Sequence, residues 1–227
     1  IPMKVLTLRP WWLPLAVAFT PAIGRAQSTG ILLKQGDALS TGEHVQAIRD
    51  ARIGDDGSWL ALVETDLADT TQNMCLLRDG VIVLREGSPV SVPAGTLVAW
   101  NELASSPLGD LGMLLRVRRD TTLIQVDGAY WNDVKVVIKD DVIQSPHLGT
   151  GTDWDTLHVV KLNSSNTMFL MGEVMNPALT RVHERALVRY QLDSAGNILD
   201  TTVLATEGMT VPAGITLAGA LCLGNNE

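Results

Sequence analysis

The sequence predicts an all-β fold built from repeated antiparallel four-stranded meanders, and three observations carry this prediction. First, a sequence phrase recurs. VLREG at 83–87 is followed by VPAG at 92–95, and VLATEG at 203–208 is followed by VPAG at 211–214, with weaker copies at residues 32–37 and 136–141. Second, short apolar runs alternate with turns rich in Gly, Asp and Asn. Third, helical periodicity is scarce, and residues 44–53 fit a strand at least as well as a helix.

The spacing of the phrase sets the size of the repeating unit. The apolar residues that precede its polar step are Leu33, Leu84, Ile138 and Leu204, separated by 51, 54 and 66 residues. The first two intervals lie close to the about 40 to 50 residues of a four-stranded propeller blade, and the third contains an insertion. The repeat therefore favours blade-like units.

Each unit shows the same order of elements. The first strand is expected at 45–48, 97–100 and 157–160, followed by turns at 54–57, 109–112 and 163–166. The second strand is expected at 59–63, 113–117 and 168–171, and the third at 74–77, 122–126 and 186–191. Asp-Gly and Asn-rich turns close the second hairpin at 78–80, 127–128 and 193–197. The recurring phrase is then the fourth strand and the corner that leaves it, with Glu86, Glu207, Gln35 and Asp140 in equivalent places.

These residues resemble a known group of proteins. Residues 32–37, 83–87 and the Asp-Asp-Gly turn at 55–57 are similar to the repeats of secreted bacterial β-propeller-like proteins, which occur in planctomycetes and often carry C-terminal surface-anchoring signals. The resemblance covers roughly residues 31 to 216, and its motifs are structural. It implies a β-propeller-like fold and transfers no catalytic residue. The third unit departs from the pattern, because Asp140 and Asp141 stand where glycine is expected.

The number of units suggests an incomplete propeller. About three blades and part of a fourth are visible, whereas closed propellers have four to eight. The strand-like run at 221–223 followed by GNNE leads us to expect a chain truncated at its C-terminus. An open arc is the alternative, and it would expose an edge strand at each end.

The first 26 residues are expected to be an export signal, which leaves 27–227 as the β-propeller-like repeat domain. Lys4 and Arg9 precede an apolar stretch at 11–20, and Gly24-Arg25-Ala26 forms a small-x-small cleavage site. The stretch is too short to span a bilayer, so we expect no stable transmembrane span in the mature chain. An uncleaved anchor is the alternative. The expected location is secreted, periplasmic or at the cell surface.

The net charge restricts the possible binding partners, and the cysteine content restricts the possible disulfides. The formal net charge of −8 argues against nucleic acid as a partner. Cys75 and Cys222 stand in apolar, strand-like contexts at different repeat positions. Buried free thiols are expected for both, with a disulfide between them as the alternative.

Motifs for catalysis or metal binding do not emerge from the sequence. The histidines at 44, 147, 158 and 183 lack metal-ligand spacing, and the acidic turns lack the Asp-x-Asp-x-Asp-Gly pattern of a calcium loop. We therefore assign no catalytic residue, no metal site and no cofactor. The candidate ligand-binding residues are an aromatic pair predicted to be exposed in a turn, Tyr130 and Trp131, and the segment Asp153, Trp154 and Asp155, whose indole could stack on a sugar between two carboxylates.

Three functional hypotheses follow. The first is an exported, non-enzymatic binding or scaffold module whose unknown extracellular ligand is a protein or a glycan. The alternative is an extracellular propeller enzyme that acts on polysaccharide through paired carboxylates. A purely structural envelope protein is a third possibility. Fold alone does not separate them.

Overall fold

The computed structural model describes residues 31–55, 57–145, 148–163, 165–176 and 183–207, and within these ranges the chain is all-β with no helix. The strands described below all belong to one compact unit that begins at Leu33. The predicted signal at 1–26, the VPAG run at 211–214 and Cys222 lie outside the described residues.

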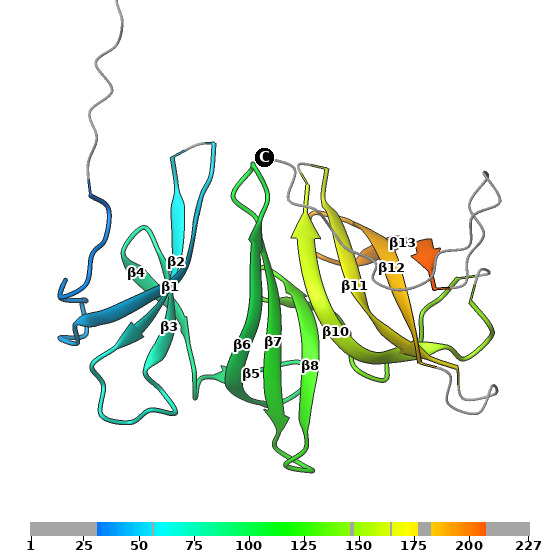
Figure 1. The fold of residues 1–227 in the computed structure, drawn as a ribbon, viewed down its shortest axis with the longest axis horizontal. Helices are drawn as coiled ribbons and strands as arrows, with labels where there is room; N and C mark the ends of the chain where they lie inside the picture. Colours follow the sequence, from blue (N-terminus) through cyan, green and yellow to red (C-terminus); the bar gives the residue numbers. More distant parts are fainter. Residues whose placement is uncertain (1–30, 56, 146–147, 164, 177–182, 208–227) are drawn as a thin grey trace, which may run out of the picture. The chain divides into compact units, whose positions relative to one another are not determined.

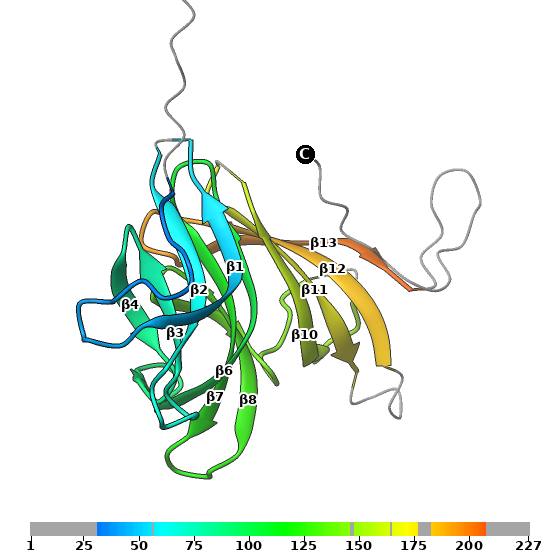
Figure 2. The same ribbon diagram turned by 60° about the vertical axis from the view of Figure 1, so that its left-hand side comes forward.

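The strands form three antiparallel sheets in which spatial order follows chain order (Figure 1). The first sheet contains β1 (Val45–Ile53), β2 (Trp59–Thr65), β3 (Met74–Arg78) and β4 (Val81–Arg85). The second contains β5 (Pro89–Val90), β6 (Gly95–Ser105), β7 (Leu111–Arg119), β8 (Gln125–Trp131) and β9 (Val134–Ile138). The third contains β10 (Asp153–Leu162), β11 (Thr167–Met175), β12 (His183–Leu192) and β13 (Ile198–Thr206), and it curls strongly along its strands (Figure 2).

The predicted antiparallel meander repeat is confirmed, with three corrections. Residues 32–33, a weak copy of the fourth-strand phrase, belong to no strand. The third strand of the second unit is Gln125–Trp131 rather than 122–126, because the turn after β7 occupies residues 120–122. The first strand of the third unit begins at Asp153 and not at 157, so our prediction placed its start four residues late.

The recurring phrase forms a corner that fastens each sheet to the next. The chain turns with a positive φ after β4 and after β9, 81° at Gly87 and 70° at Asp140, and Gly36, which precedes β1, has the same conformation with a φ of 87°. The backbone N–H of each of these residues donates to the first strand of the following sheet. These bonds join Gly36 to Val45 (2.8 Å), Gly87 to Leu97 (2.8 Å) and Asp140 to Trp154 (2.7 Å).

The corner also corrects one equivalence that we predicted. The backbone N–H groups of Glu86, Lys139 and Glu207 donate to Met74, Asp127 and Arg185, the counterpart residues at the start of each third strand. Lys139, and not Asp140, therefore shares the position of Glu86. An acid is not required at this position, because the backbone N–H makes the repeated contact.

Bulges recur at the same places in all three sheets. In each first strand two residues, three positions apart, drop out of the pairing with the second strand. Each fourth strand also has a bulged residue at an equivalent place, and β13 has a second one at Leu199. The pairs in the first strands are Gln46 and Arg49, Val98 and Asn101, and Asp155 and His158; the equivalent fourth-strand residues are Val83, Val136 and Leu204. Bulges increase the local twist of a strand. Their recurrence shows that the three sheets are structural repeats.

Three apolar cores alternate with the sheets. One core covers the face of the first sheet that carries Cys75, and Leu33 and Leu39 pack against it. A second lies between the first and second sheets, and a third lies between the second and third sheets. Alternate residues of β7 enter different cores, with Met113 in the second and Leu114 in the third. The second sheet is therefore buried on both faces, as period-2 patterning of continuous apolar runs predicts.

Candidate functional site

The aromatic residues that we selected from the sequence are core residues. Tyr130 and Trp131 are 2 % exposed and Trp154 is fully buried. The expected exposure of the Tyr130–Trp131 pair is wrong, because both residues lie in β8, on opposite faces of a sheet that is covered on both sides. The Trp154 indole N–H donates to the Tyr190 hydroxyl at 2.9 Å inside the core, so its face is not open to a sugar.

The carboxylates beside Trp154 do come together with other charges. Asp153 and Asp155 alternate with the buried indole along β10, next to the corner that carries Lys139 and Asp140. The Lys139 ammonium pairs with the Asp155 carboxylate and also donates to the Asp155 carbonyl oxygen at 2.9 Å. Burial raises the pKa of Asp153, and the negative charges of Asp140 and Asp155 raise it further. No group of three or more His, Cys, Asp or Glu side chains in the described ranges could hold a metal ion.

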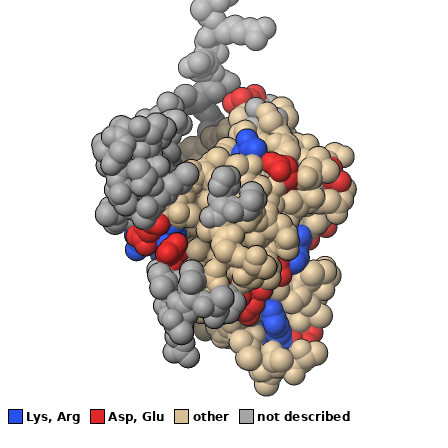
Figure 3. All heavy atoms as spheres, turned by 90° about the vertical axis from the view of Figure 1, so that its right-hand side faces the viewer, with Lys and Arg blue, Asp and Glu red and all other residues tan. Residues whose placement is uncertain are grey.

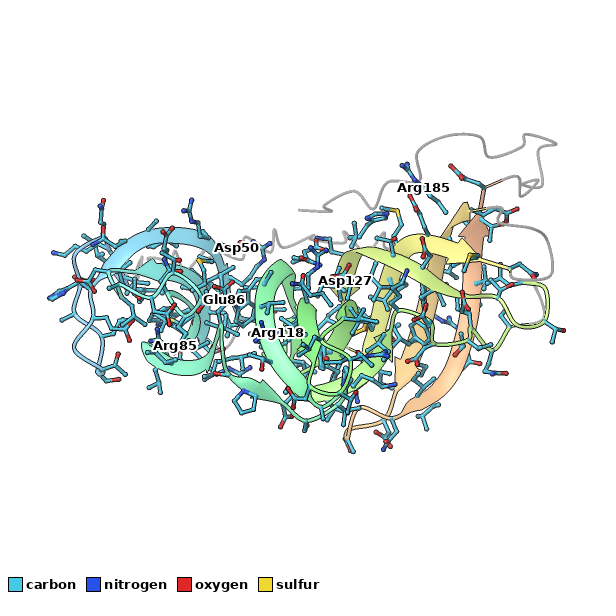
Figure 4. All side chains as sticks on the ribbon, turned by 90° about the horizontal axis from the view of Figure 1, so that it is seen from below. Asp50, Arg85, Glu86, Arg118, Asp127 and Arg185 are labelled. Carbon is cyan, nitrogen blue, oxygen red and sulfur yellow. The ribbon has the colours of Figure 1, made fainter. Side chains whose placement is uncertain are left out.

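A second carboxyl with a raised pKa lies at the first corner. Glu86 follows β4 and is half-buried, and Figure 4 marks it next to Arg85. Burial is the main cause of its raised pKa, and the Glu64 carboxylate adds to it. Glu64 is itself paired with Arg49 across β1 and β2.

A hollow lies between the first and second sheets, and we call it the first cleft. Its volume is about 580 Å³, within the range of small-molecule sites. Side chains from β3, β4, β7 and β8 supply an apolar floor: Leu76, Leu84, Leu111, Met113, Leu115 and Tyr130. The two-residue strand β5 closes one side with Pro89 and Val90.

Polar groups surround this apolar floor. Arg78, at the end of β3, reaches across to the second sheet and donates to the Gly109 carbonyl oxygen at 3.2 Å. Asp110 accepts from the Ser106 hydroxyl at 3.1 Å in the β6–β7 turn. Asn132, in the β8–β9 turn, accepts at its side-chain oxygen from the Leu111 backbone N–H at 3.0 Å. The lining therefore combines an apolar interior with one cation and two acids, Asp110 and Asp133.

A wider groove of about 780 Å³ lies at the surface between β9 and β13. Its two acids, Asp141 and Asp200, come from different repeats. Both acids are engaged, because Asp141 pairs with Lys135 at 2.8 Å and Asp200 pairs with Arg189 at 3.2 Å. Figure 3 shows acidic and basic side chains interspersed on the visible face.

Tyr130 is the one predicted site residue among those that line the first cleft, and our sequence analysis did not select the cleft's cation, Arg78. A signal was present: once the turns after the third strands are superposed, Arg78 occupies the place of Trp131. In both units the following residue, Asp79 or Asn132, binds the first residue of the second strand through its side chain and its N–H. Finding this correspondence needs the correct third-strand register, which our prediction for the second unit lacked.

Comparison with known protein families, curated proteins and solved structures found no match. Within the described ranges, no helix has the length and apolar character needed to cross a membrane.

Proposed function

We propose that this chain is an exported, β-propeller-like module that binds an extracellular ligand without chemical conversion, and that the first cleft is its binding site. The observation that carries the proposal is the cleft itself, with its apolar floor, its volume of about 580 Å³ and its few convergent polar groups. This combination is typical of ligand sites. The blade-like arrangement is supported by the repeated corners and bulges, and export is supported by the pattern of residues 1–26.

Binding of Nile red, a neutral apolar dye, tests the site. We expect one dye per chain with increased emission, and a loss of affinity of about tenfold or more in Leu84→Trp, because the indole would fill the cleft floor. Leu204→Trp is the matched control, since Leu204 also lies in a fourth strand and does not line the cleft. Equal binding by wild type and Leu84→Trp would contradict the proposed site.

Export has a separate test. Residues 1–26 fused to alkaline phosphatase, which is active only after export, should give active enzyme, and deletion of residues 11–20 should abolish the activity. Activity no higher than that of the enzyme without a leader would refute the export proposal.

The enzymatic alternative retains one supporting observation. Asp153, with its raised pKa, and Asp155, held as an ion pair by Lys139, have the unequal character of an acid and a base. If they act on polysaccharide, purified protein should release reducing ends, and Asp153→Asn should abolish the release while the unfolding midpoint is retained. Binding remains the better proposal, because Asp155 is committed to Lys139 and neither acid lines the first cleft.

A further inference from the structure

The apolar layer between the first and second sheets, the first layer, is structurally equivalent to the apolar layer between the second and third sheets, the second layer. Different side chains occupy the two layers. A pair of residues from the second and third strands occupies equivalent positions in the two layers, Met113 with Tyr130 in one and Leu170 with Val188 in the other. Fourth-strand residues also correspond, since Val83 and Val136 are the bulged residues of β4 and β9. The positions in one layer can therefore be compared directly with those in the other.

Two indole rings fill space in the second layer. Trp131 enters it from β8 and Trp154 from β10, and both belong to its core. The corresponding residues of the first layer are Arg78 and Leu97. Leu97 corresponds to Trp154 because each accepts the corner N–H, from Gly87 and Asp140 respectively. Leu76 in place of Ala129 restores part of the lost volume, and the first cleft remains where the indole of Trp131 would lie.

Arg78 brings a charge to this apolar space. Its side chain is half-buried, and within the described residues its one hydrogen-bond acceptor is the Gly109 carbonyl and no carboxylate lies within ion-pair distance. A guanidinium has five N–H donors arranged for planar, bidentate binding of an anion. Asp110 is held by Ser106 and Asn132, and Asp133 is exposed in the β8–β9 turn.

We propose that the first cleft takes a planar aromatic anion, whose ring system occupies the volume that Trp131 fills in the second layer and whose carboxylate or similar group pairs with Arg78. This inference rests on the proposed binding function of the same cleft. The apolar floor favours the ring system through burial of its surface, and the charge-assisted bidentate contact selects the anion over its neutral analogue.

The test compares 2-naphthoate with its neutral analogue 2-naphthylmethanol by titration calorimetry on the full chain. Wild type should bind 2-naphthoate more tightly than 2-naphthylmethanol. Arg78→Met, which keeps an apolar lining, should weaken 2-naphthoate about tenfold or more and leave 2-naphthylmethanol within about threefold. Arg78→Trp should weaken both probes at least about tenfold without lowering the unfolding midpoint, because the cleft is then filled as in the second layer. Arg49→Met, in an exposed ion pair on β1, is the control and should change neither affinity.

The outcomes separate this inference from the proposed function. If Arg78→Met binds 2-naphthoate as tightly as wild type, or if wild type does not prefer the anion, the assignment of an anionic ligand is overturned while Nile red binding can stand. If wild type binds neither naphthalene probe nor Nile red, the cleft is not a binding site and both proposals fail.

Discussion

Glu43 holds the segment before β1 onto the edge of the first sheet. Its carboxylate accepts from the Thr65 hydroxyl at 2.5 Å and from the Arg85 guanidinium at 3.0 Å, and Thr41 adds a contact at 2.8 Å. Burial alone would raise the pKa of Glu43, but the hydrogen bonds from Thr65 and Arg85 outweigh it and the pKa is lowered. The ionised carboxylate therefore stabilises the fold.

Replacement of this carboxylate should have a pH-dependent cost. Because the folded pKa is lowered, the stabilisation is complete above the ordinary glutamate value of 4.5 and is lost as the pH falls through the folded pKa. Glu43→Gln should lower the free energy of unfolding by about 1–2 kcal/mol at pH 7, and the difference from wild type should shrink below pH 4.5. Urea unfolding at a series of pH values measures this. A difference that grows on acidification would contradict the assignment.

Cys75 is a buried free cysteine, in agreement with the expectation from its apolar context. Burial raises the pKa of its thiol to about 11, so little thiolate forms at neutral pH. In a Cys222→Ser variant, Cys75 should not react with Ellman's reagent at pH 8 until denaturant is added. Rapid modification of the folded protein would show that this core opens easily.

At the scale of the elements, the corners decide how one sheet passes to the next. The corner position needs a positive φ, which glycine adopts without strain and other residues adopt at a cost. It is glycine at residues 36 and 87 and aspartate at 140. At Gly87 a Cβ would also lie 2.8 Å from the Gln72 Cγ. The same backbone geometry is therefore relaxed at two corners and strained at the third.

Opposite substitutions at equivalent corners should have opposite effects. Gly87→Ala should lower the free energy of unfolding by about 1–2 kcal/mol, because it adds both strain and a close contact. Asp140→Gly should raise it by about 0.5–1 kcal/mol, and it also removes a negative charge near Asp153. Chemical denaturation of both variants beside wild type measures the two changes. Effects of the same sign would show that the corners are not equivalent.

The repeated fourth-strand bulge also has an element-scale role. β4 and β13 are the last strands of their sheets, and Val83 and Leu204 are partly exposed on them. A bulge twists an edge and hinders pairing with another chain. This explains why the most recognisable phrase of the sequence contains an unpaired residue.

At the scale of the whole molecule, stability depends on the two layers between sheets. Trp131 and Trp154 fill the second layer, whereas the first layer leaves a cleft. Trp131→Ala should therefore act on stability, lowering the free energy of unfolding by about 3–5 kcal/mol. Binding at the first cleft should be unaffected in the fraction that remains folded, because Trp131 does not line it.

Equilibrium unfolding followed by circular dichroism measures the change, with Trp59→Ala as the control. Trp59 is only half-buried, so its removal should cost less. A cost below about 1 kcal/mol for Trp131→Ala, combined with loss of ligand binding, would instead restore the direct binding role that we first predicted for this ring.

Local sequence patterns predicted much of the fold but little of the candidate site. The turns at 54–57 and 78–80 and the apolar runs between them place β2 and β3 correctly, because turn chemistry and period-2 burial act over a few residues. Trp131 shows where this reasoning stops. Its neighbours Gly128 and Asn132 suggested an exposed turn, yet Gly128 lies within β8. The burial of an aromatic residue beside a turn signal can be predicted correctly only when the facing sheet is known.

The sequence by itself determined that this chain is all-β, that its unit is a four-stranded antiparallel meander, and that the recurring phrase is a fourth strand with its corner. It could do so because strand patterning, turn residues and the repeat are written in neighbouring residues. Only the tertiary structure decided which side chains meet between the sheets. Arg78 and Trp131 hold equivalent positions 53 residues apart, and one leaves a cleft where the other fills it. That difference depends on packing between segments distant in sequence, which no local pattern records.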